Sequence, residues 1–299
     1  MIRAALTIGA VLFAAVIAAA WWLTRPFPPE DAALADRRGD AGRGAALFVQ
    51  AGCASCHVGP DAEDGDGPPL LAGGQRFETS YGTFYAPNIT PGPAGVGDWS
   101  EADLVSALAA GVSPSGAHLY PALPYTSYEN ARTQDLLDIA AHLKTLPVSD
   151  VASRPHDLSF PFGIRRALGA WKRLYADRGW VLEEPANERI ARGRYLAEAL
   201  FHCGQCHTPR TRLGGMDRSR WLQGAANPNG DGRIPGIAPG QLDWNDTDVA
   251  AYLTTGLTPD YDSAGGHMVA VIENLSTLPE DDITAIVAYL RAVPPAEPG

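Results

Sequence analysis

Free thiols are the most telling shortage in this sequence. Its 299 residues contain four cysteines, and all four fall in two short runs, Cys53-Ala-Ser-Cys56-His57 and Cys203-Gly-Gln-Cys206-His207. No cysteine is left over for a disulfide, for a catalytic nucleophile or for a thiolate bond to iron. Methionine is nearly as rare, with three residues in all, so few thioether sulfurs can serve as metal ligands.

Positive charge is also scarce. The sequence has 23 Lys and Arg against 34 Asp and Glu, which gives a formal net charge of −11. This balance argues against nucleic acid and against an anionic membrane surface as partners, and it suits salt-dependent docking to a basic protein surface. At 45% hydrophobic and 19% charged residues the composition is that of a folded protein, and the length allows two domains of ordinary size.

Each cysteine pair has the Cys-x-x-Cys-His pattern that attaches a c-type haem. Two thiols one helical turn apart can form thioethers to the two vinyl groups of one porphyrin, and the histidine that follows can bind its iron. The sequence therefore predicts two covalent haem c groups. The predicted cofactor-binding residues are Cys53, Cys56, His57, Cys203, Cys206 and His207, with both histidines as iron ligands.

Two other uses of paired cysteines fit less well. A zinc site built from both pairs would normally place them about 15–20 residues apart, whereas here nearly half the chain separates them. A thioredoxin-like dithiol would need neither a second copy nor the histidines. Haem attachment accounts for the wide separation of the two pairs, for the second copy and for the histidine after each pair.

The N-terminus carries an apolar segment, Ala4–Leu23, that contains no charged residue. About twenty apolar residues can cross a bilayer as a helix, and Trp21-Trp22 would then sit at its far interface. Ala18-Ala19-Ala20 could instead be the cleavage site of a signal peptide. We favour an uncleaved anchor, with Arg3 inside and the rest of the chain on the periplasmic side of the bacterial inner membrane.

The two halves of the chain repeat one another. Trp99–Asp103 matches Trp244–Asp248 at an offset of 145 residues (244 minus 99), and Ile139–Leu143 matches Ile286–Leu290. A repeat of this length around a haem motif predicts two homologous domains, and the helical periodicity makes each of them all-α. The predicted organisation is a signal or anchor at 1–25, a spacer at 26–39, domains at 40–150 and 185–299, and a linker at 151–184.

The linker contains a predicted amphipathic helix. Ile164, Leu168, Trp171 and Tyr175 recur at helical spacing with basic residues between them. This helix could pack against one or both domains, or its basic residues could face haem propionates.

Further motifs complete the pattern in order along the chain: Pro87-Asn-Ile-Thr-Pro91, then Leu119-Tyr-Pro-Ala-Leu-Pro-Tyr-Thr-Ser-Tyr128. Together with the haem motifs, this order resembles the membrane-anchored dihaem cytochromes c that are similar to the cytochrome subunits of bacterial alcohol and gluconate dehydrogenases. Those subunits commonly carry three haems, whereas this chain carries two motifs. The resemblance implies an all-α fold, two class I cytochrome c domains in tandem after a transmembrane helix, and a periplasmic electron carrier.

The second haem has a candidate for the ligand opposite its histidine. Met268 follows a Gly-rich loop and precedes the last helix, where such domains supply a sixth ligand, and His267 is its neighbouring rival. Met1 and Met216 are poorly placed for this role. We also expect the carbonyl of Pro209 to orient the ring of His207.

The first haem lacks such a methionine. At the 145-residue offset Leu123 takes the place of Met268, and Ala131 stands where related chains often carry a methionine. The nearest donor is His118, which would give a bis-histidine haem of lower potential. Tyr120 and Tyr125 are weaker candidates, and an open or water-bound iron is the other reading.

These observations favour electron transfer over substrate chemistry, since no catalytic residues stand out. The chain is predicted to pass electrons from a periplasmic dehydrogenase or another donor to a respiratory acceptor, such as a terminal oxidase or a soluble cytochrome. It could then be a subunit of an oxidoreductase complex. The alternative is a peroxidase-like haem enzyme that uses an open site on the first iron.

Overall fold

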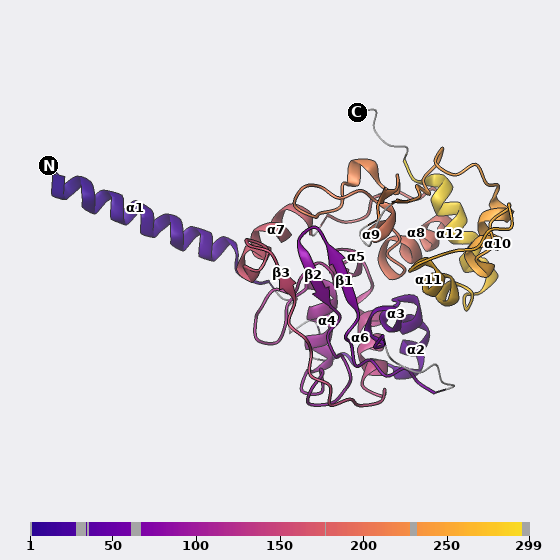
Figure 1. The fold of residues 1–299 in the computed structure, drawn as a ribbon, viewed down its shortest axis with the longest axis horizontal. Helices are drawn as coiled ribbons and strands as arrows, with labels where there is room; N and C mark the ends of the chain where they lie inside the picture. The colour runs from indigo at the N-terminus through magenta and orange to yellow at the C-terminus, as the bar shows by residue number, and fades with distance from the viewer. Residues whose placement is uncertain are drawn as a thin grey trace.

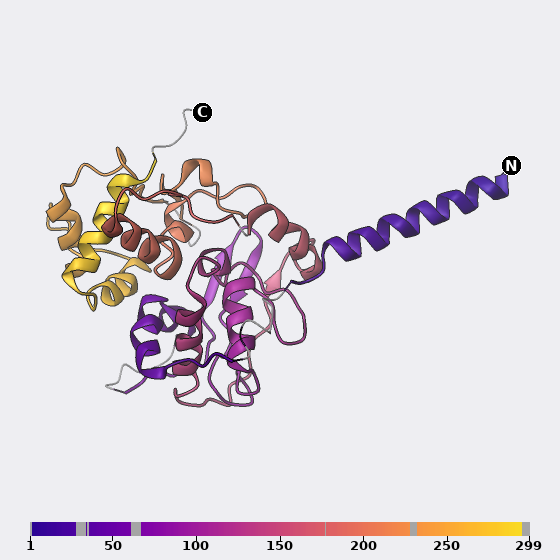
Figure 2. The ribbon, with the colours of Figure 1, turned by 180° about the vertical axis from the view of Figure 1, so that it is seen from behind.

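In a computed structural model the chain forms a helical body from which one long helix projects (Figures 1 and 2). The structure describes residues 2–27, 34, 36–60, 67–176, 178–227 and 232–294. The projecting helix is α1 (Ile2–Leu23), which has no buried residue. Within the described ranges it is the one helix long and apolar enough to cross a membrane, a test that a signal sequence also passes. Residues 28–33 and 35 of the predicted spacer lie outside the described part, as do residues 295–299 of the second predicted domain.

The helices of the first half gather into one lobe, which we call the N-terminal unit. They are α2 (Ala41–Gln50), α3 (Cys53–His57), α4 (Glu101–Ala110), α5 (Tyr125–Tyr128) and α6 (Thr133–Leu143). Their apolar faces meet in a single cluster that includes Phe48, Leu104 and Leu136. α2 leads directly into the first haem motif, and α6 is the last helix of this half.

The helices of the second half form the C-terminal unit around a separate cluster that includes Leu196, Leu253 and Ile286. They are α8 (Glu188–Arg194), the π-helical segment η3 (Tyr195–Leu200), α9 (Gly204–His207), the 3-10 helix η4 (Arg218–Arg220), α10 (Asp246–Thr255), α11 (Met268–Leu275) and α12 (Glu280–Ala292). Figure 1 shows this unit beside the N-terminal unit, with its last helix, α12, between α8 and α10.

The fold is mostly helical, and short strands add to the expected all-α pattern. An antiparallel three-stranded sheet joins β1 (Arg76–Thr79), β2 (Gly82–Tyr85) and β3 (Asp157–Leu158). A smaller pair joins β4 (Ala225–Ala226) and β5 (Arg233–Ile234). These strands are too short to give a readable alternation of apolar and polar side chains.

Each unit depends on a close crossing of its first and last helices at a glycine. A Cβ on Gly44 of α2 would overlap the carbonyl oxygen of Asp138 in α6, and one on Gly193 of α8 would overlap that of Ala285 in α12. His142 and Tyr289 lie beside these two glycines in equivalent positions. Here His142 also packs against Phe48, with ring centroids 5.3 Å apart.

Backbone hydrogen bonds repeat between the units at the same offset as the sequence. Ser100 caps α4 and forms a capping box with Asp103, while Asn245 caps α10 through the amide of Asp248. Both helices end at a left-handed glycine, Gly111 or Gly256. Only glycine adopts this conformation without steric cost, so the same turn leads into the same loop in both units.

The linker between the units contains a 3-10 turn, η2 (Arg165–Ala167), followed by α7 (Leu168–Tyr175). This confirms the predicted helix and shows what it packs against. Trp171 donates to the carbonyl of Leu213 in the C-terminal unit at 2.8 Å, and Lys172 donates to the carbonyl of Gly111 in the N-terminal unit at 2.7 Å. The helix therefore contacts both units.

Adding a methyl group at the helix crossing should unfold the N-terminal unit first. We expect Gly44→Ala to destabilise it by about 1–3 kcal/mol or more, because the new Cβ meets backbone that cannot move without parting α2 from α6. Thermal unfolding followed by circular dichroism would show a lowered midpoint. Gly67→Ala, where a Cβ meets nothing within 4 Å, is the control. Equal midpoints for both variants would contradict this account.

Candidate haem sites

Both Cys-x-x-Cys-His runs lie on a short helix that directly follows the opening helical segment of a unit. Gly52, with φ of 65°, turns the chain from α2 into α3, and in the second unit His202, with φ of 42°, makes the equivalent turn. The short helix then places both cysteines and the histidine of each motif close together on the surface. Cys53 packs against the N-terminal cluster and Cys203 against the C-terminal cluster, so each pair borders an apolar core.

The two histidines are held in the same way. Nδ1 of His57 donates to the carbonyl of Pro87 at 2.9 Å, and Nδ1 of His207 donates to that of Pro235 at 2.8 Å. A carbonyl can only accept, so the proton is on Nδ1 and the Nε2 lone pair is free to bind iron. Burial lowers the pKa of both imidazoles, which keeps them neutral as metal binding requires.

The expected role of Pro209 is wrong. Its carbonyl accepts from the amide of Asp217 at 2.9 Å and does not contact the ring of His207. The orienting carbonyl belongs to Pro235, which lies much further along the chain. A loop brings it back because Gly224 donates to the carbonyl of His207 at 2.7 Å, as Gly73 does to that of His57 at 2.8 Å.

The Pro87 carbonyl is fixed by the residue that follows it. The side-chain nitrogen of Asn88 donates to the carbonyls of Ser149 and Val151 at 3.1 and 2.7 Å, and its side-chain oxygen accepts from the amide of Thr90 at 2.8 Å. Asn88 is buried with all these bonds made. The Pro87–Pro91 motif thus positions the histidine of the first site.

The thiols are not those of a redox-active dithiol. Burial raises the pKa of Cys53 and of Cys203 to about 12, so both sulfurs are protonated at neutral pH. A redox-active cysteine has a lowered pKa, because the thiolate is the reactive form. Among the described residues no group of three or more His, Cys, Asp or Glu could hold a metal ion. Paired thiols beside a neutral histidine suit a thioether-bound haem.

Met268 is the first residue of α11 and packs against the same apolar cluster as Cys203. Its rival His267 lies just before the helix, and its ring stacks on Phe77 of the N-terminal unit at 5.9 Å between centroids. The structure thus engages His267 elsewhere and leaves the Met268 side chain at the C-terminal core.

The matching loop of the N-terminal unit carries Leu123 in that place. Leu119 donates to the carbonyl of Gly111 at 2.7 Å, and in the other unit Ala264 donates to that of Gly256 at 2.8 Å. The bridges Val112–His118 and Leu257–Ser263 also correspond. The backbone equivalence makes Leu123 the counterpart of Met268 and makes His118 the counterpart of a serine.

His118 is only 3% exposed and lies at the end of α1. Its Nε2 donates to the carbonyl of Thr24 at 2.9 Å, and its Nδ1 has no hydrogen-bond partner in the described part of the chain. Burial lowers the pKa of this imidazole, so it is neutral. To bind iron through Nε2, the ring would have to leave Thr24.

The two tyrosines named as weaker donors differ, because only Tyr120 has a hydrogen-bonded hydroxyl; that of Tyr125 is buried without a partner among the described residues. The hydroxyl of Tyr120 donates to the carbonyl of Phe162 at 3.2 Å. Tyr125 packs its ring against Gly111 and Lys172, and desolvation raises the pKa of its phenol well above the ordinary value. A phenol held protonated is a poor ligand for iron.

The two haem motifs meet across the boundary between the units. Gln205 of the second motif donates to the hydroxyls of Thr126 and Ser127 in α5, both at 3.1 Å. Asn274 of α11 donates to the hydroxyl of Ser55 in the first motif at 3.2 Å. In the repeat α5 and α11 occupy corresponding stretches. Each motif is thus bonded to the equivalent helix of the opposite unit.

Side chains beside the two haem motifs also meet across the boundary between the units. Desolvation, and then the charge on Cys206, raise the pKa of Cys56 to about 11. Tyr128 donates to the carbonyl of Ala51 within the N-terminal unit at 2.6 Å, and across the boundary its ring packs edge-on against His202 of the C-terminal unit, with 5.6 Å between ring centroids. Sequence reasoning missed this junction, since nothing in the spacing of Gln205 or Asn274 signals it.

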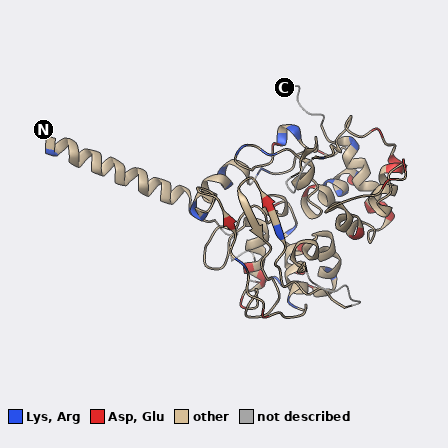
Figure 3. Cartoon of the chain, viewed as in Figure 1, with Lys and Arg blue, Asp and Glu red and all other residues tan. Residues whose placement is uncertain are grey.

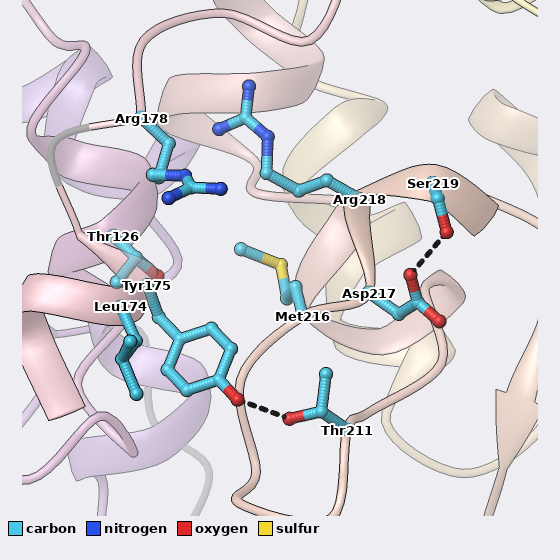
Figure 4. A pocket seen from close by; sticks show the side chains of 9 residues that line it. All are labelled: Thr126, Leu174, Tyr175, Arg178, Thr211, Met216, Asp217, Arg218 and Ser219. Atoms are coloured by element: carbon cyan, nitrogen blue, oxygen red, sulfur yellow. Dashed lines mark hydrogen bonds between the residues drawn. The ribbon is translucent and has the colours of Figure 1, made fainter.

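A separate cavity of about 250 Å³ lies between α7, α5 and the loop after His207. Figure 4 shows the guanidinium groups of Arg178 and Arg218 at one edge of it, with the Met216 side chain pointing in between. Tyr175 closes the far side by a 2.9 Å hydrogen bond to Thr211. Met216 therefore lines this linker cavity.

Comparison with known proteins gives the same answer as the geometry. The cytochrome c family model matches residues 41–147. The chain is 51% identical to a dihaem c-type cytochrome of Cereibacter sphaeroides, over 99% of this chain and 100% of that protein.

More distant relatives are parts of dehydrogenases. The chain is 39% identical to the fructose dehydrogenase cytochrome subunit of Gluconobacter japonicus over 90% of its length, and 35% identical to the gluconate 2-dehydrogenase cytochrome c subunit of Pantoea cypripedii over 88%. It spans 56% and 62% of those two subunits. The chain belongs to the dihaem c-type cytochromes, which are related to the cytochrome c subunits of dehydrogenases, and it carries two haem c groups.

Proposed function

We propose that this protein carries electrons on the periplasmic side of the inner membrane, from a dehydrogenase to a respiratory acceptor. The observation that carries the proposal is the pair of haem motifs bonded to each other's unit across a shared boundary. Such an arrangement serves passage of an electron from one haem to the other. The dehydrogenase subunits among the relatives support a dehydrogenase as the donor.

Each unit is a class I cytochrome c domain in this proposal, with boundaries at 40–150 and 185–299. The glycine crossing of first and last helices and the short haem-bearing helix support it. The uncleaved α1 holds both domains at the membrane. Its last turn is bonded to the linker, which we take as support for an anchor retained in the mature protein.

The cysteines, histidines and prolines of each site have different roles in holding the haem. Cys53, Cys56, Cys203 and Cys206 tether the porphyrins, and His57 and His207 bind iron through Nε2. The carbonyls of Pro87 and Pro235 hold these rings by accepting hydrogen bonds from Nδ1–H. The bound haem supplies one-electron redox chemistry, and the protein tunes its potential through the ligand opposite the histidine.

The two sites differ on that opposite side. We place Met268 at the second haem and no protein ligand at the first, because Leu123 holds the equivalent position and His118 is bonded to Thr24. A methionine ligand raises the potential. With Met268 as its ligand, the second haem would be the better electron acceptor of the two.

A peroxidase would use the open first site differently. It would need a side chain over the iron that accepts a proton from peroxide. Leu123 cannot do so, which favours the electron carrier.

Reduced protein should pass its electrons to a carrier rather than consume peroxide. Full-length protein is reduced and mixed with oxidised soluble cytochrome c, and separately with hydrogen peroxide, in a stopped-flow absorbance experiment. We expect rapid reduction of the cytochrome and no multiple-turnover loss of peroxide. Fast peroxide turnover without transfer to the cytochrome would favour the enzyme instead.

Carbon monoxide should distinguish the two irons. We expect the reduced protein to bind about one CO per chain, since a methionine-ligated haem resists CO and an open one does not. Leu123→Met, a swap that preserves volume, should fill the first site and abolish this binding. Met268→Ala should open the second iron and raise the stoichiometry to about two.

His118→Ala provides the matched control for that titration. If the ring serves only Thr24, CO stoichiometry and the spin state of both haems stay as in the unaltered protein. Two low-spin haems in the parent, with one converted to high spin by His118→Ala, would instead make His118 the sixth ligand.

The hydrogen bonds between the units should affect the rate of electron transfer between the haems. Gln205→Ala and Asn274→Ala each remove contacts worth about 0.5–1.5 kcal/mol per hydrogen bond. We expect the double variant to slow internal electron transfer after rapid photoreduction, with haem content unchanged. Thr254→Ala, whose hydroxyl bonds only within α10, is the control. An unchanged rate in the double variant would show that these contacts do not set the haem-to-haem geometry.

A further inference from the structure

The segment that joins the two units also packs against the C-terminal end of α1. Figure 1 and Figure 2 both show α1 leaving the body beside β3 and α7. Gly169 of α7 lies against Thr24 so closely that a Cβ there would overlap its carbonyl oxygen. Residues 157–175, which we call the linker foot, thus lie on the face of the body from which α1 projects.

The basic residues of the linker foot bond the end of α1. Arg166 donates to the hydroxyl of Thr24 at 3.1 Å and to the carbonyl of Trp21 at 2.5 Å, and Arg173 donates to the carbonyl of Leu23. These carbonyls belong to the last turn of α1, which has no intrahelical donors for them. Cations at this end also offset the negative pole of the helix.

The same foot exposes large apolar side chains next to these arginines. Phe160 is 87% exposed, Ile164 is 48% exposed and Phe162 is 37% exposed. Trp21 and Trp22, at the end of α1, are exposed beside them. Protein surfaces that lie at the boundary between lipid headgroups and acyl chains are typically rich in tryptophan, phenylalanine and arginine.

Charge on the foot has the sign that phospholipid attracts. Figure 3 shows Lys and Arg gathered where α1 meets the body, while Asp and Glu dominate the far end around α10 and α12. The molecule carries −11 overall, so this positive end is a local exception. It faces the side from which α1 projects.

We propose that the linker foot lies on the phospholipid bilayer, with Phe160, Phe162 and Ile164 inserted at the headgroup boundary and the arginines level with the phosphates. The inference rests on the proposed anchoring by α1, because the span fixes which face of the body meets the membrane. The foot adds a second contact that fixes the tilt of the body.

Spin labelling tests the proposal on the full-length protein. All four native cysteines are used in thioethers, so one added cysteine provides a single labelling site. Phe160→Cys places the label on the foot, and Tyr261→Cys, at a residue 89% exposed in the C-terminal unit, is the matched control. Val11→Cys in α1 reports on the anchor. The labelled proteins are reconstituted in nanodiscs of phosphatidylcholine and phosphatidylglycerol.

Accessibility of each label to oxygen, which enters lipid, is compared with that to a water-soluble nickel chelate. We expect the label at residue 160 to favour oxygen over the chelate by at least several-fold relative to that at residue 261. A lipid-like value at residue 11 with a water-like value at residue 160 would overturn the foot and keep the anchor. A water-like value at residue 11 would overturn the anchor itself, and the foot with it.

Discussion

The close contact between the first and last helix of each unit determines where everything else lies. Gly44 and Gly193 let the backbones of α2 and α6, and of α8 and α12, meet without an intervening side chain. The haem-bearing turn follows soon after that contact along the chain, so its direction follows from the crossing. Because the crossing is the same in both units, both histidines find a proline carbonyl at nearly the same distance, 2.9 Å in one unit and 2.8 Å in the other.

The loops that follow α4 and α10 have equivalent backbones but carry different side chains. Their hydrogen bonds correspond from Gly111 to Leu119 and from Gly256 to Ala264. Shortly afterwards one loop presents Leu123 and the other Met268. Leucine and methionine have nearly the same volume, so the exchange alters a potential ligand with little cost to packing. The two units can therefore differ in redox behaviour while keeping one fold.

Much of this was predictable from sequence, and the failures have clear physical causes. The haem motifs, the 145-residue repeat, the linker helix and the leucine at the methionine position all follow from local patterns. The carbonyl that orients His207 does not, because Pro235 reaches the ring only through a long loop. The bonds of Gln205 and Asn274 depend on how the two units dock, and single-residue patterns carry no information about docking. The domain boundaries stay a prediction.

The linker had the clearest pattern and the least predictable partner. The helical spacing of its apolar residues predicted the helix. Its basic residues, however, were compatible either with packing against the domains or with contact to haem propionates. In the structure Arg165 bonds the carbonyl of His118, Lys172 the end of α4, and Arg166 and Arg173 the end of α1. All four groups thus satisfy backbone carbonyls, mostly at helix ends, that lack donors of their own. One short helix consequently connects the first helix, the N-terminal unit and, through Trp171, the C-terminal unit, so that movement of any one of them must disturb the contacts of the others.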